Sequence, residues 1–254
     1  MKLSIIIPVF DNWNYTRALL KDLAQLPLDH EVIIVDNGSR DDTHKSCALW
    51  ASDGLCATIL HNNHPTTPGK DRPWNLRCIQ NKENKGFAKA CNQGYEIAKG
   101  KHILFLNNDV RVTKDYDTWT EDLINAAVPG SLVGPNGGLL DEYFNFVRET
   151  TTIEPGNFYM SGWCLCAQKE TFDKLLVEGN EFKGPFSEEF GIAYFEDTDL
   201  GIRASEASLV FKIVPVSLVH FGKCTSKKIG ISQLYQTAKV IFVNKWTKRR
   251  AGKC

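Results

Sequence analysis

The sequence has no excess of either charge and no apolar stretch long enough to cross a bilayer. Its 254 residues include 30 Lys and Arg and 30 Asp and Glu, so the formal net charge is zero. A general nucleic-acid binder needs a basic surplus to neutralise phosphates, whereas binding one nucleotide needs only local charge. A transmembrane helix needs about 20 consecutive apolar residues. We therefore expect no nucleic-acid partner and, at most, peripheral contact with a membrane.

Zinc-binding cysteine patterns and a secretion signal are also missing. The eight cysteines form no pair of Cys-x-x-Cys motifs and no cluster with histidine, which argues against structural zinc. The apolar run that opens the chain is broken by Pro8 and meets Asp11 without a small-residue cleavage site, so it predicts a strand. We expect a cytoplasmic protein with reduced thiols, in which Cys164 and Cys166 share one face of a strand.

The phosphate-binding loops that follow the first strand in many nucleotide-binding proteins are absent. A dinucleotide fold would place Gly-x-Gly-x-x-Gly there, but residues 8–12 read Pro-Val-Phe-Asp-Asn. The P-loop pattern is missing as well. A nucleotide, if this chain binds one, must be held by another arrangement.

The chain does contain an alternation of strand and helix patterns. Apolar β-branched runs predict buried strands, and apolar residues at helical spacing predict the helices between them. In the first half these patterns predict strands at 3–8, 31–36, 57–60 and 103–106, and helices at 12–25, 41–51 and 86–99. Residues 61–82 contain three prolines and are expected to form a long irregular loop. The alternation predicts an α/β fold with a mostly parallel, doubly wound sheet.

The second half is less regular. Its patterns predict helices at 116–127, 169–177, 196–207 and 231–246, strands at 131–134, 158–167 and 209–214, and an irregular polar stretch at 135–155. We find no internal repeat and no linker between two cores. The sequence therefore predicts a single domain over residues 1–254.

One strand in this pattern ends on polar side chains. Residues 103–109 read Ile-Leu-Phe-Leu-Asn-Asn-Asp, a buried strand followed by two amides and a carboxylate. Ligands bind at the carboxyl ends of strands in open α/β sheets. Asp109 can hold a divalent cation through oxygen, and Asn107 and Asn108 can hydrogen-bond a sugar or phosphate. The alternative is that Asn-Asn-Asp only forms a turn.

Five segments in this order resemble the family-2 glycosyltransferases of the GT-A fold, and most closely a rhamnosyltransferase-like subgroup. The segments are 5–10, 35–39, 84–94, 106–109 and 195–200. The resemblance extends from residue 3 to about residue 222. It implies a GT-A type single domain with a nucleotide-binding half over 1–110, a more irregular acceptor-binding and catalytic half over 111–222, and a C-terminal helix and tail over 223–254.

The resemblance also implies an activity. The expected enzyme is an inverting hexosyl- or deoxyhexosyltransferase of polysaccharide biosynthesis. It would move a sugar from a UDP-, dTDP- or GDP-sugar to a hydroxyl of a glycan or a lipid-linked acceptor. Two other functions stay open: a nucleotidyltransferase that makes sugar nucleotides, and a degenerate nucleotide- or glycan-binding module without catalysis. The first usually has a glycine-rich loop after its first strand, which this chain lacks.

Ten residues match donor-binding positions of these glycosyltransferases. They are Pro8, Val9, Phe10, Asp36, Asn84, Gly86, Lys89, Asn92, Asn107 and Asn108. Asp36 would accept a hydrogen bond from the base or the ribose. Gly86 would permit close backbone approach at a helix start that favours anions. Asp36 can instead be a turn acid, and Lys89 can lie on a solvated helix face.

The resemblance places Asn107-Asn108-Asp109 at the family's Asp-x-Asp metal motif, with Asn107 in place of the first acid. It implies a divalent cation, Mn²⁺ or Mg²⁺, held by Asp109 and the donor's diphosphate, because Mg²⁺ is commonly bound by one or two carboxylates with phosphate oxygens. His220 matches a histidine that some relatives use as a further ligand. The alternative for His220 is a core histidine with a satisfied hydrogen bond.

The segment 196–199, Glu-Asp-Thr-Asp, carries the expected general base. The resemblance assigns the base to the Glu-Asp pair, and we expect Asp197 to be the base, with Glu196 orienting the acceptor or sharing the task. The helix dipole is expected to lower the pKa of Asp197 and keep it ionised. The alternative is that these acids only stabilise a helix start. Asp199 and Arg203 are expected to form a surface pair.

Two further features have open interpretations. Gly162 and Trp163 match a region between donor and acceptor, where Trp163 would stack on a sugar ring or belong to the core. The basic segment 245–253 contains Trp246 and would either contact an anionic membrane carrying a lipid-linked acceptor or be a frayed terminus.

Overall fold

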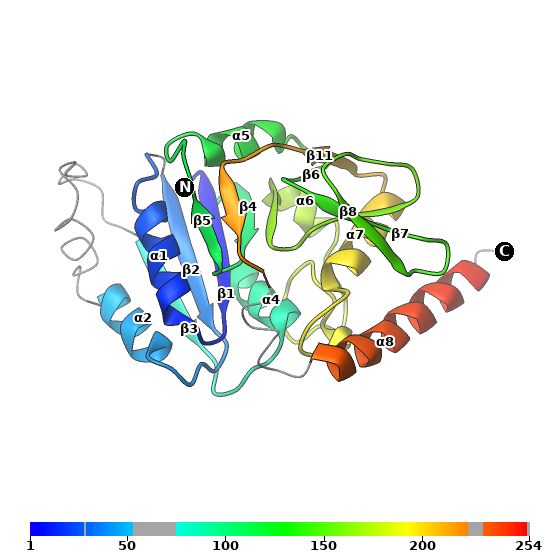
Figure 1. The fold of residues 1–254 in the computed structure, drawn as a ribbon, viewed down its shortest axis with the longest axis horizontal. Helices are drawn as coiled ribbons and strands as arrows, with labels where there is room; N and C mark the ends of the chain where they lie inside the picture. Colours follow the sequence, from blue (N-terminus) through cyan, green and yellow to red (C-terminus); the bar gives the residue numbers. More distant parts are fainter. Residues whose placement is uncertain (28, 53–74, 223–230, 253–254) are drawn as a thin grey trace.

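A seven-stranded sheet in the order β11-β6-β10-β4-β1-β2-β3 lies at the centre of the computed structural model, which describes residues 1–27, 29–52, 75–222 and 231–252 (Figure 1). Its strands are β1 (Leu3–Val9), β2 (His30–Asp36), β3 (Asn75–Gln80), β4 (His102–Leu106), β6 (Ser131–Gly134), β10 (Cys164–Gln168) and β11 (Val210–Ile213). Neighbours run parallel except β10, which is antiparallel to β4 and β6. The expected α/β fold with a mostly parallel sheet is confirmed.

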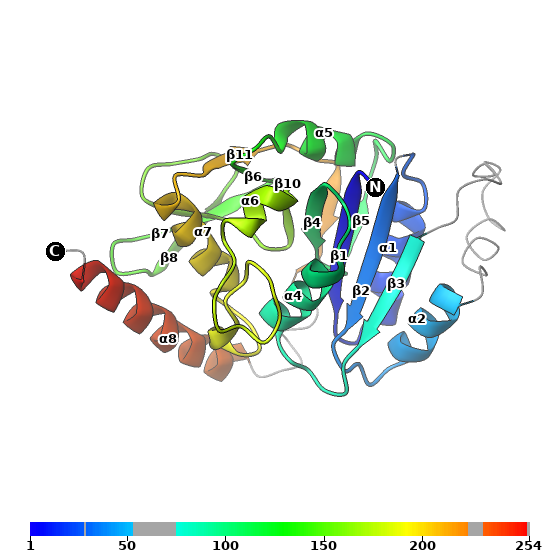
Figure 2. The ribbon, with the colours of Figure 1, turned by 180° about the vertical axis from the view of Figure 1, so that it is seen from behind.

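The central strands carry near-continuous apolar runs because both faces of the sheet are covered. Ile5, Ile6 and Ile7 of β1 are all fully buried. Ile5 and Ile7 pack with α1, whereas Ile6 packs with α4 in a separate cluster on the other face. Figures 1 and 2 show α1 and α4 on opposite sides of the sheet. Parallel strands covered in this way have near-continuous hydrophobic runs, as the sequence of β1 and β4 shows.

The helices connect and cover these strands. They are α1 (Trp13–Leu23), α2 (Thr43–Ser52), α4 (Phe87–Ile97), α5 (Trp119–Ala126), α6 (Lys169–Asp173), α7 (Glu196–Glu206) and α8 (Ile231–Ala251), with one 3₁₀ turn at Glu188–Phe190. The helix expected at 169–177 therefore ends at Asp173. Among the helices that the structure describes, none is long and apolar enough to cross a membrane.

The expectation of an irregular stretch at 135–155 was wrong. β7 (Gly137–Leu140), β8 (Phe146–Thr150) and β9 (Asn157–Met160) form an antiparallel sheet in the order β8-β7-β9. β8 escaped prediction because four of its five residues are exposed, so it has no apolar pattern. β7 was not predicted because it begins with two glycines, which are untypical of strands. Glycine is needed at position 138 because a Cβ there would lie 2.5 Å from the Tyr159 ring.

Two other expectations of extended structure need correction. Within the loop expected at 61–82, residues 75–80 form β3, an edge strand whose Arg77 pairs with the buried Glu31 of β2. The strand expected at 158–167 is in fact β9 and β10, which belong to different sheets and are separated at residues 161–163. The strand expected at 57–60 lies outside the described residues. A further two-stranded sheet pairs β5 (Val110–Val112) with β12 (Leu218–His220).

Helix α8 packs firmly on the second half of the molecule (Figure 2). Ala238, Phe242 and Trp246 are buried in one cluster with Phe195, and the helix continues to residue 251. The frayed-terminus interpretation of 245–253 is therefore wrong as far as residue 251.

One buried carboxylate joins α7 to α8. Asp199 Oδ1 accepts a 3.0 Å hydrogen bond from Trp246 Nε1 and lies 2.8 Å from Lys245 Nζ. Asp199 Oδ2 lies 2.7 Å from Arg203 Nε. The Asp199–Arg203 pair exists, but Asp199 is fully buried, so the expected surface position was wrong. The spacing of four residues between Asp199 and Arg203 predicted their ion pair, but it could not predict that α8 covers this pair.

The described cysteines fit the expectation of free thiols. Cys47, Cys78, Cys91, Cys164 and Cys166 form no disulfide. Cys164 and Cys166 are fully buried in the same core cluster, as their spacing on one strand predicts.

Candidate active site

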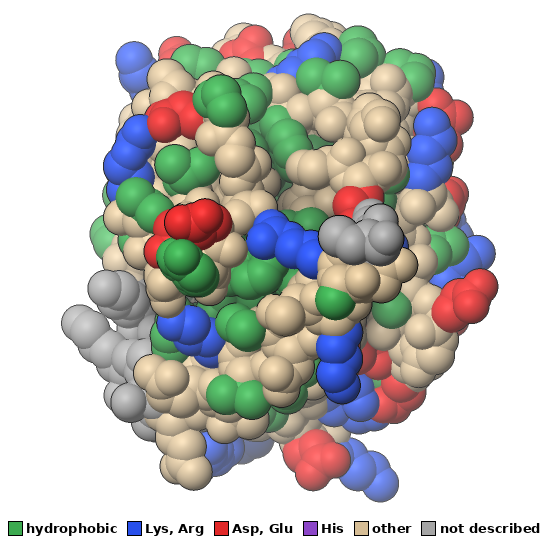
Figure 3. Space-filling view, turned by 90° about the vertical axis from the view of Figure 1, so that its right-hand side faces the viewer, with side chains coloured by type: hydrophobic (Ala, Val, Ile, Leu, Met, Phe, Trp, Pro, Cys, Tyr) green, Lys and Arg blue, Asp and Glu red, His purple; other side chains and the backbone are tan. Residues whose placement is uncertain are grey.

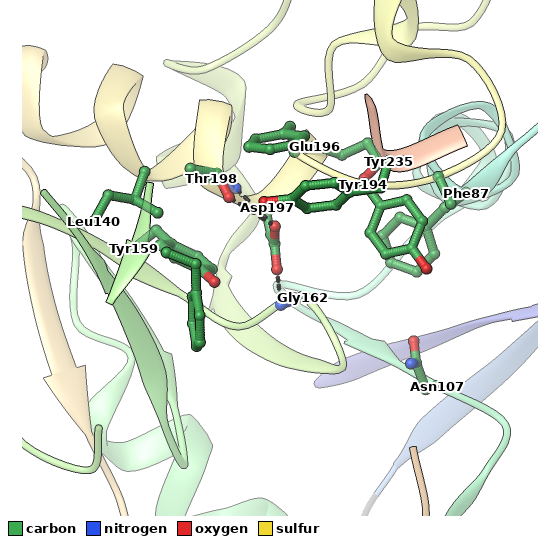
Figure 4. Close-up of a pocket in the computed structure, with 13 residues that line it drawn as sticks. Phe87, Asn107, Leu140, Tyr159, Gly162, Tyr194, Glu196, Asp197, Thr198 and Tyr235 are labelled. Carbon is green, nitrogen blue, oxygen red and sulfur yellow. Dashed lines mark hydrogen bonds between the residues drawn. The ribbon is translucent and has the colours of Figure 1, made fainter. Parts of the chain in front are cut away.

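A cavity of about 320 Å³ opens between the end of β4 and the start of α7 (Figure 4). Asn107 and Asp197, which are far apart in the sequence, both line it. The complete lining is Phe87, Asn107, Leu140, Phe146, Tyr159, Gly162, Ala193, Tyr194, Phe195, Glu196, Asp197, Thr198 and Tyr235. Two of the segments that carry the predicted site residues therefore meet in one space.

The chain enters α7 through a strained turn. Tyr194 and Phe195 have φ values of 83° and 70°, in the left-handed region that bulky residues rarely adopt. Such conformations cost of order 1–3 kcal/mol each and persist where packing holds them. Here both rings pack on Tyr235 of α8, with ring centroids 5.5 and 5.3 Å away. The turn places Glu196 and Asp197 at the first positions of the helix, beside the cavity.

Two backbone amides hold the Asp197 carboxylate. Gly162 N–H donates to Oδ2 at 3.0 Å, and Thr198 N–H donates to Oδ1 at 2.8 Å. These hydrogen bonds lower the pKa, but loss of hydration is the larger effect and the pKa of Asp197 is raised. The expectation of a lowered pKa was therefore wrong, because the carboxylate is withdrawn from water. A carboxylate with a raised pKa is a better proton acceptor.

Glu196 lies deeper than its neighbour. Its side chain is only 4% exposed, and Oε1 has no hydrogen-bond partner among the residues that the structure describes. Burial raises the pKa of Glu196 to about 8, and the nearby Asp197 charge adds to the shift. At pH 7 this side chain is therefore mostly a neutral carboxylic acid that can donate a hydrogen bond.

This pKa shift predicts a pH-dependent stability. An acid with a raised pKa binds its proton more tightly in the folded state, so its stabilising effect is complete below pH 4.5 and is lost as the pH rises to about 8. Between these limits the free energy of unfolding should fall by about 1.4 kcal/mol per pH unit from this group. The Glu196→Gln variant, which is neutral at every pH, should lack this slope.

The measurement is urea unfolding of the wild type and the variant at several pH values between 5 and 8. The exposed Glu149 of β8 offers the matched control, because Glu149→Gln should keep the wild-type slope. Parallel slopes for Glu196→Gln and the wild type would show that Glu196 is ionised in the folded protein at neutral pH.

At the end of β4 the structure brings together the two predicted metal ligands. Asp109 Oδ1 lies 3.1 Å from His220 Nε2, and Asn107 Nδ2 lies 3.4 Å from the same nitrogen. Trp163 stacks on the His220 ring at 4.8 Å. Asn108 instead donates to Thr16 Oγ1 at 3.1 Å and is buried against α1. Trp163 therefore covers the histidine, and Asn108 has a structural contact.

These residues can supply part of a cation's coordination shell. Within the described part of the chain there is no group of three or more His, Cys, Asp or Glu residues that could hold a metal ion by themselves. Asp109 and His220 offer one carboxylate and one imidazole. Such a pair suits a cation whose remaining ligands are water and phosphate oxygens, as is common for Mg²⁺.

Among the predicted donor-binding residues, Asp36 keeps one free acceptor. It is fully buried, and Oδ1 accepts a 3.0 Å hydrogen bond from the Ser39 amide, which is the turn interaction expected as its alternative. Its second oxygen, Oδ2, is buried without a hydrogen-bond partner in the described residues. An unsatisfied buried carboxylate oxygen is costly unless a ligand donates to it. Val9, to which Asp36 pairs in the sheet, is buried, whereas Pro8 and Phe10 are partly exposed.

The loop before α4 is fixed by its own polar groups. Asn37 Nδ2 donates to Asn84 Oδ1 at 2.9 Å and to the Gly86 carbonyl at 3.1 Å. Gly86 has φ 95°, and a Cβ there would lie 2.1 Å from the Gly191 carbonyl oxygen. Only glycine fits this contact, which holds the predicted donor loop against the segment that leads into α7.

The two remaining predicted residues on α4 make contacts within the protein. The amide of Asn92 is fully buried and bonds both the N–H and the carbonyl of Phe186. Lys89 Nζ lies 2.7 Å from Glu181, which also pairs with Lys85. These hydrogen bonds lower the pKa of Glu181 to about 2. Donor contacts of Asn92 and Lys89 stay predictions, and Lys89 would have to exchange Glu181 for a phosphate.

Several lining residues were missed by the sequence analysis. Phe146, Tyr159 and Tyr235 come from β8, β9 and α8, and no motif marks them. Tyr194 lies two residues before Glu196 of the Glu-Asp motif, which is the one signal that could have indicated it. Aromatic residues from distant segments meet here through packing, and sequence spacing does not reveal such contacts.

The sequence of this chain is similar to the sequences of known glycosyltransferases. The chain is 28% identical over 178 residues to an uncharacterized glycosyltransferase of Rickettsia prowazekii, covering 58% of this chain and 55% of that protein. It is 22% identical to the glycosyltransferase GlyG of Streptococcus pneumoniae, covering 68% of this chain and 48% of that protein. The chain thus spans about half the length of these curated relatives.

Solved structures share the fold at low sequence identity. The structure of GalNAc-T7 with UDP, GalNAc and Mn²⁺ matches 86% of this chain and 43% of its own, with TM-score 0.63 and 14% identity. The mannosyltransferase PcManGT of Pyrobaculum calidifontis, in complex with GDP-Man and Mn²⁺, matches 84% of this chain and 55% of its own, with TM-score 0.56 and 16% identity. The family model described as Glycosyl transferase family 2 matches residues 4–132. The chain belongs to glycosyl transferase family 2, and it has the GT-A fold that its motifs implied.

Proposed function

We propose that this chain transfers a hexosyl or deoxyhexosyl group from a nucleotide-sugar to a hydroxyl acceptor, with inversion at the anomeric carbon. The observation that carries the proposal is the shared cavity: Asn107, at the end of β4, and Asp197, at the start of α7, line the same space. A donor held at the first and an acceptor held at the second would meet there. Membership of the family and the nucleotide-sugar bound by PcManGT support this assignment.

Asp197 is the proposed general base. Its carboxylate, fixed by the Gly162 and Thr198 amides, takes the proton of the acceptor hydroxyl while that oxygen attacks the anomeric carbon. The bond to the nucleotide diphosphate breaks on the opposite face of the sugar. Glu196, neutral at pH 7, donates a hydrogen bond that orients the acceptor. No covalent intermediate is needed, so the reaction uses no Ser or Cys nucleophile.

The first half is proposed as the nucleotide-binding half. The unpaired Asp36 oxygen would accept from the base or the ribose, beside Pro8, Val9 and Phe10. Asp109 and His220 would hold a divalent cation, Mn²⁺ or Mg²⁺, which neutralises the charge that develops on the leaving diphosphate. Both solved relatives named above contain Mn²⁺. The catalytic half over 111–222 and the C-terminal helix would then bind the acceptor.

The proposal is tested by measuring stabilisation and turnover with a panel of small molecules. UDP-, dTDP- and GDP-sugars, and the matching nucleoside triphosphates, are added with Mn²⁺ or Mg²⁺. One nucleotide-sugar should raise the melting temperature by about 5–10 °C at about a hundred times its Kd. It should also be hydrolysed slowly in water, releasing the nucleotide diphosphate.

Other outcomes would contradict the proposal in different ways. Consumption of a nucleoside triphosphate together with a sugar 1-phosphate would identify a nucleotidyltransferase. Stabilisation by a nucleotide-sugar without hydrolysis and without transfer to any added alcohol would identify a binding module.

A further inference from the structure

Most of the aromatic rings that line the cavity beside Asp197 come from segments outside the part of the chain that matches the family model. Tyr235 comes from α8, Phe146 from β8 and Tyr159 from β9, whereas the match ends at residue 132. Figure 4 shows Tyr159 and Leu140 on one side of the Asp197 carboxylate and Tyr235 on the other. These three rings therefore lie in a part of the chain that the family model does not match.

All three of these rings retain exposed surface, and Tyr159 is partly exposed like Tyr235. Phe146 is 50% exposed, and Tyr235 is partly exposed although it packs on Tyr194 and Phe195. By contrast, Phe195 is only 7% exposed and fills the core beneath α8. Phe146 and Tyr235 are thus placed to contact a molecule that enters the cavity, whereas Phe195 holds the wall in position.

Side-chain contacts join the two walls of the cavity, which are formed by β8 and α8. Lys239 of α8 donates to Asn145, the neighbour of Phe146, at 2.8 Å. Phe144, in the turn before β8, packs edge-on against Phe242 of α8 with ring centroids 5.4 Å apart. Arg250 of α8 lies over the Phe144 ring and donates to Asn157 at 2.9 Å. The spacing between β8 and α8 is therefore fixed before any ligand binds.

We propose that Phe146 and Tyr235 form an acceptor subsite for a sugar ring, which they contact through its C–H faces while its hydroxyl reaches Asp197. This inference rests on the proposed glycosyl transfer and names the acceptor class. Aromatic rings supply large, rigid apolar contact, and the adjacent Glu196, Asp197 and Thr198 supply hydrogen-bond partners for hydroxyl groups. The cavity is at the lower end of the roughly 300–1,000 Å³ typical of small-molecule sites.

The surroundings of the cavity favour a saccharide over a lipid chain. A prenyl chain needs a continuous apolar groove, but the exposed Phe146 and Val147 of β8 are followed by the exposed Arg148 and Glu149. On the face that carries α8 and β8, charged and apolar side chains are interspersed (Figure 3). A mixed surface of this kind suits a polar acceptor with apolar faces.

The experiment separates acceptor use from donor use. Methyl pyranosides of several common sugars serve as acceptor probes, farnesyl phosphate serves as the lipid counterpart, and donor hydrolysis in water is followed in parallel. Phe146→Ala should raise the acceptor KM by about threefold to tenfold with the donor KM unchanged, and Tyr235→Ala should raise the acceptor KM as well. Tyr235→Phe should retain acceptor use, because it keeps the ring.

The chain offers matched controls on the same two elements. Val147→Ala of β8 and Val240→Ala of α8 replace exposed apolar residues that do not line the cavity, so they should leave the acceptor KM unchanged. If Tyr235→Ala disturbs the fold, Phe146→Ala still tests the acceptor subsite, because it alters an exposed strand residue.

Each remaining outcome contradicts one of the two proposals. Donor hydrolysis with transfer to farnesyl phosphate alone would replace the saccharide assignment by a lipid acceptor. Donor hydrolysis with no pyranoside accepted, or with unchanged acceptor KM in both alanine variants, would overturn the subsite. Absence of both nucleotide-sugar binding and hydrolysis would instead overturn the proposed function.

Discussion

Replacing Asp197 with Asn is expected to reduce sugar transfer by about 10²–10⁴-fold, the range typical of a lost general base, while nucleotide-sugar binding changes little. The amide keeps the size and position of the carboxylate but cannot take a proton from the acceptor hydroxyl. The measurement is the transfer rate at saturating donor and acceptor, together with the Kd of the nucleotide-sugar. Substitution of Asp197 should therefore lower the transfer rate far more than it changes the Kd of the nucleotide-sugar.

The Asn substitution has a structural cost that must be measured separately. Both carboxylate oxygens of Asp197 accept from backbone amides, those of Gly162 and Thr198. An amide can accept with only one of its two terminal atoms, so one of these N–H groups loses its partner. The expected loss of stability is about 1–3 kcal/mol. Asp197→Ala should lose transfer to a similar extent, although it loses both hydrogen bonds.

A matched control lies on the same helix. Glu206 is an exposed acid at the end of α7, where it pairs with Arg249. Glu206→Gln should leave the transfer rate unchanged, because surface ion pairs contribute roughly 0–1 kcal/mol and this one is remote from the cavity. Undiminished turnover by a folded Asp197→Asn protein would exclude Asp197 as the base.

The raised pKa of Asp197 adds a pH dependence to this expectation. Transfer should fall as the pH drops through the pKa of the base, and burial places that pKa above its ordinary value. The sequence alone indicated the opposite direction, because three acids at a helix start suggest stabilisation of the charged form. Burial depends on Gly162 and the aromatic residues around the cavity. These come from distant segments, so the spacing within the motif could not reveal it.

The difference between local patterns and contacts from distant segments also explains which parts of the fold could be predicted from the sequence. The runs in β1 and β4 are buried on both faces, so each residue carries the signal and the strands were predicted. β8 lies at a sheet edge and its first four residues, apolar and charged alike, are exposed, so its pairing with β7 leaves no periodic pattern. The position of α8 against the cavity depends on contacts between distant elements, such as the hydrogen bond from Trp246 to Asp199 and the packing of Phe242 on Phe195.

Removal of the Asp109 carboxylate is the second large effect that we expect. Asp109→Asn should weaken binding of the nucleotide diphosphate on the order of a hundredfold when Mn²⁺ is present and hardly at all when it is absent. Asp109 contributes through the cation, so its effect should vanish without one. Calorimetric titration of UDP, dTDP and GDP, with and without Mn²⁺, measures both conditions. Asp117→Asn, an exposed acid of the same segment, is the control.

The same titration distinguishes a metal-assisted site from a metal-free one. A loss of affinity that is equal with and without Mn²⁺ would mean that Asp109 acts without a cation and that the site is metal-free. His220→Ala should show a smaller Mn²⁺-dependent loss, because imidazole suits this hard cation less well than carboxylate oxygen. Its stacking partner Trp163 also donates a 2.9 Å hydrogen bond from Nε1 to Asn136 Oδ1, which this substitution leaves in place.

The residue at position 107 should determine how strongly diphosphate binding depends on the cation. It lines the cavity and lies 3.4 Å from His220 Nε2, so a carboxylate at this position would face the same space as Asp109. Asn107→Asp supplies the second acid of an Asp-x-Asp motif, and charged oxygen ligands bind Mn²⁺ more strongly than an amide does. The variant should therefore need less Mn²⁺ for half-maximal diphosphate binding. An unchanged Mn²⁺ requirement would place the cation away from Asn107, with Asp109, His220, water and phosphate oxygens as its ligands.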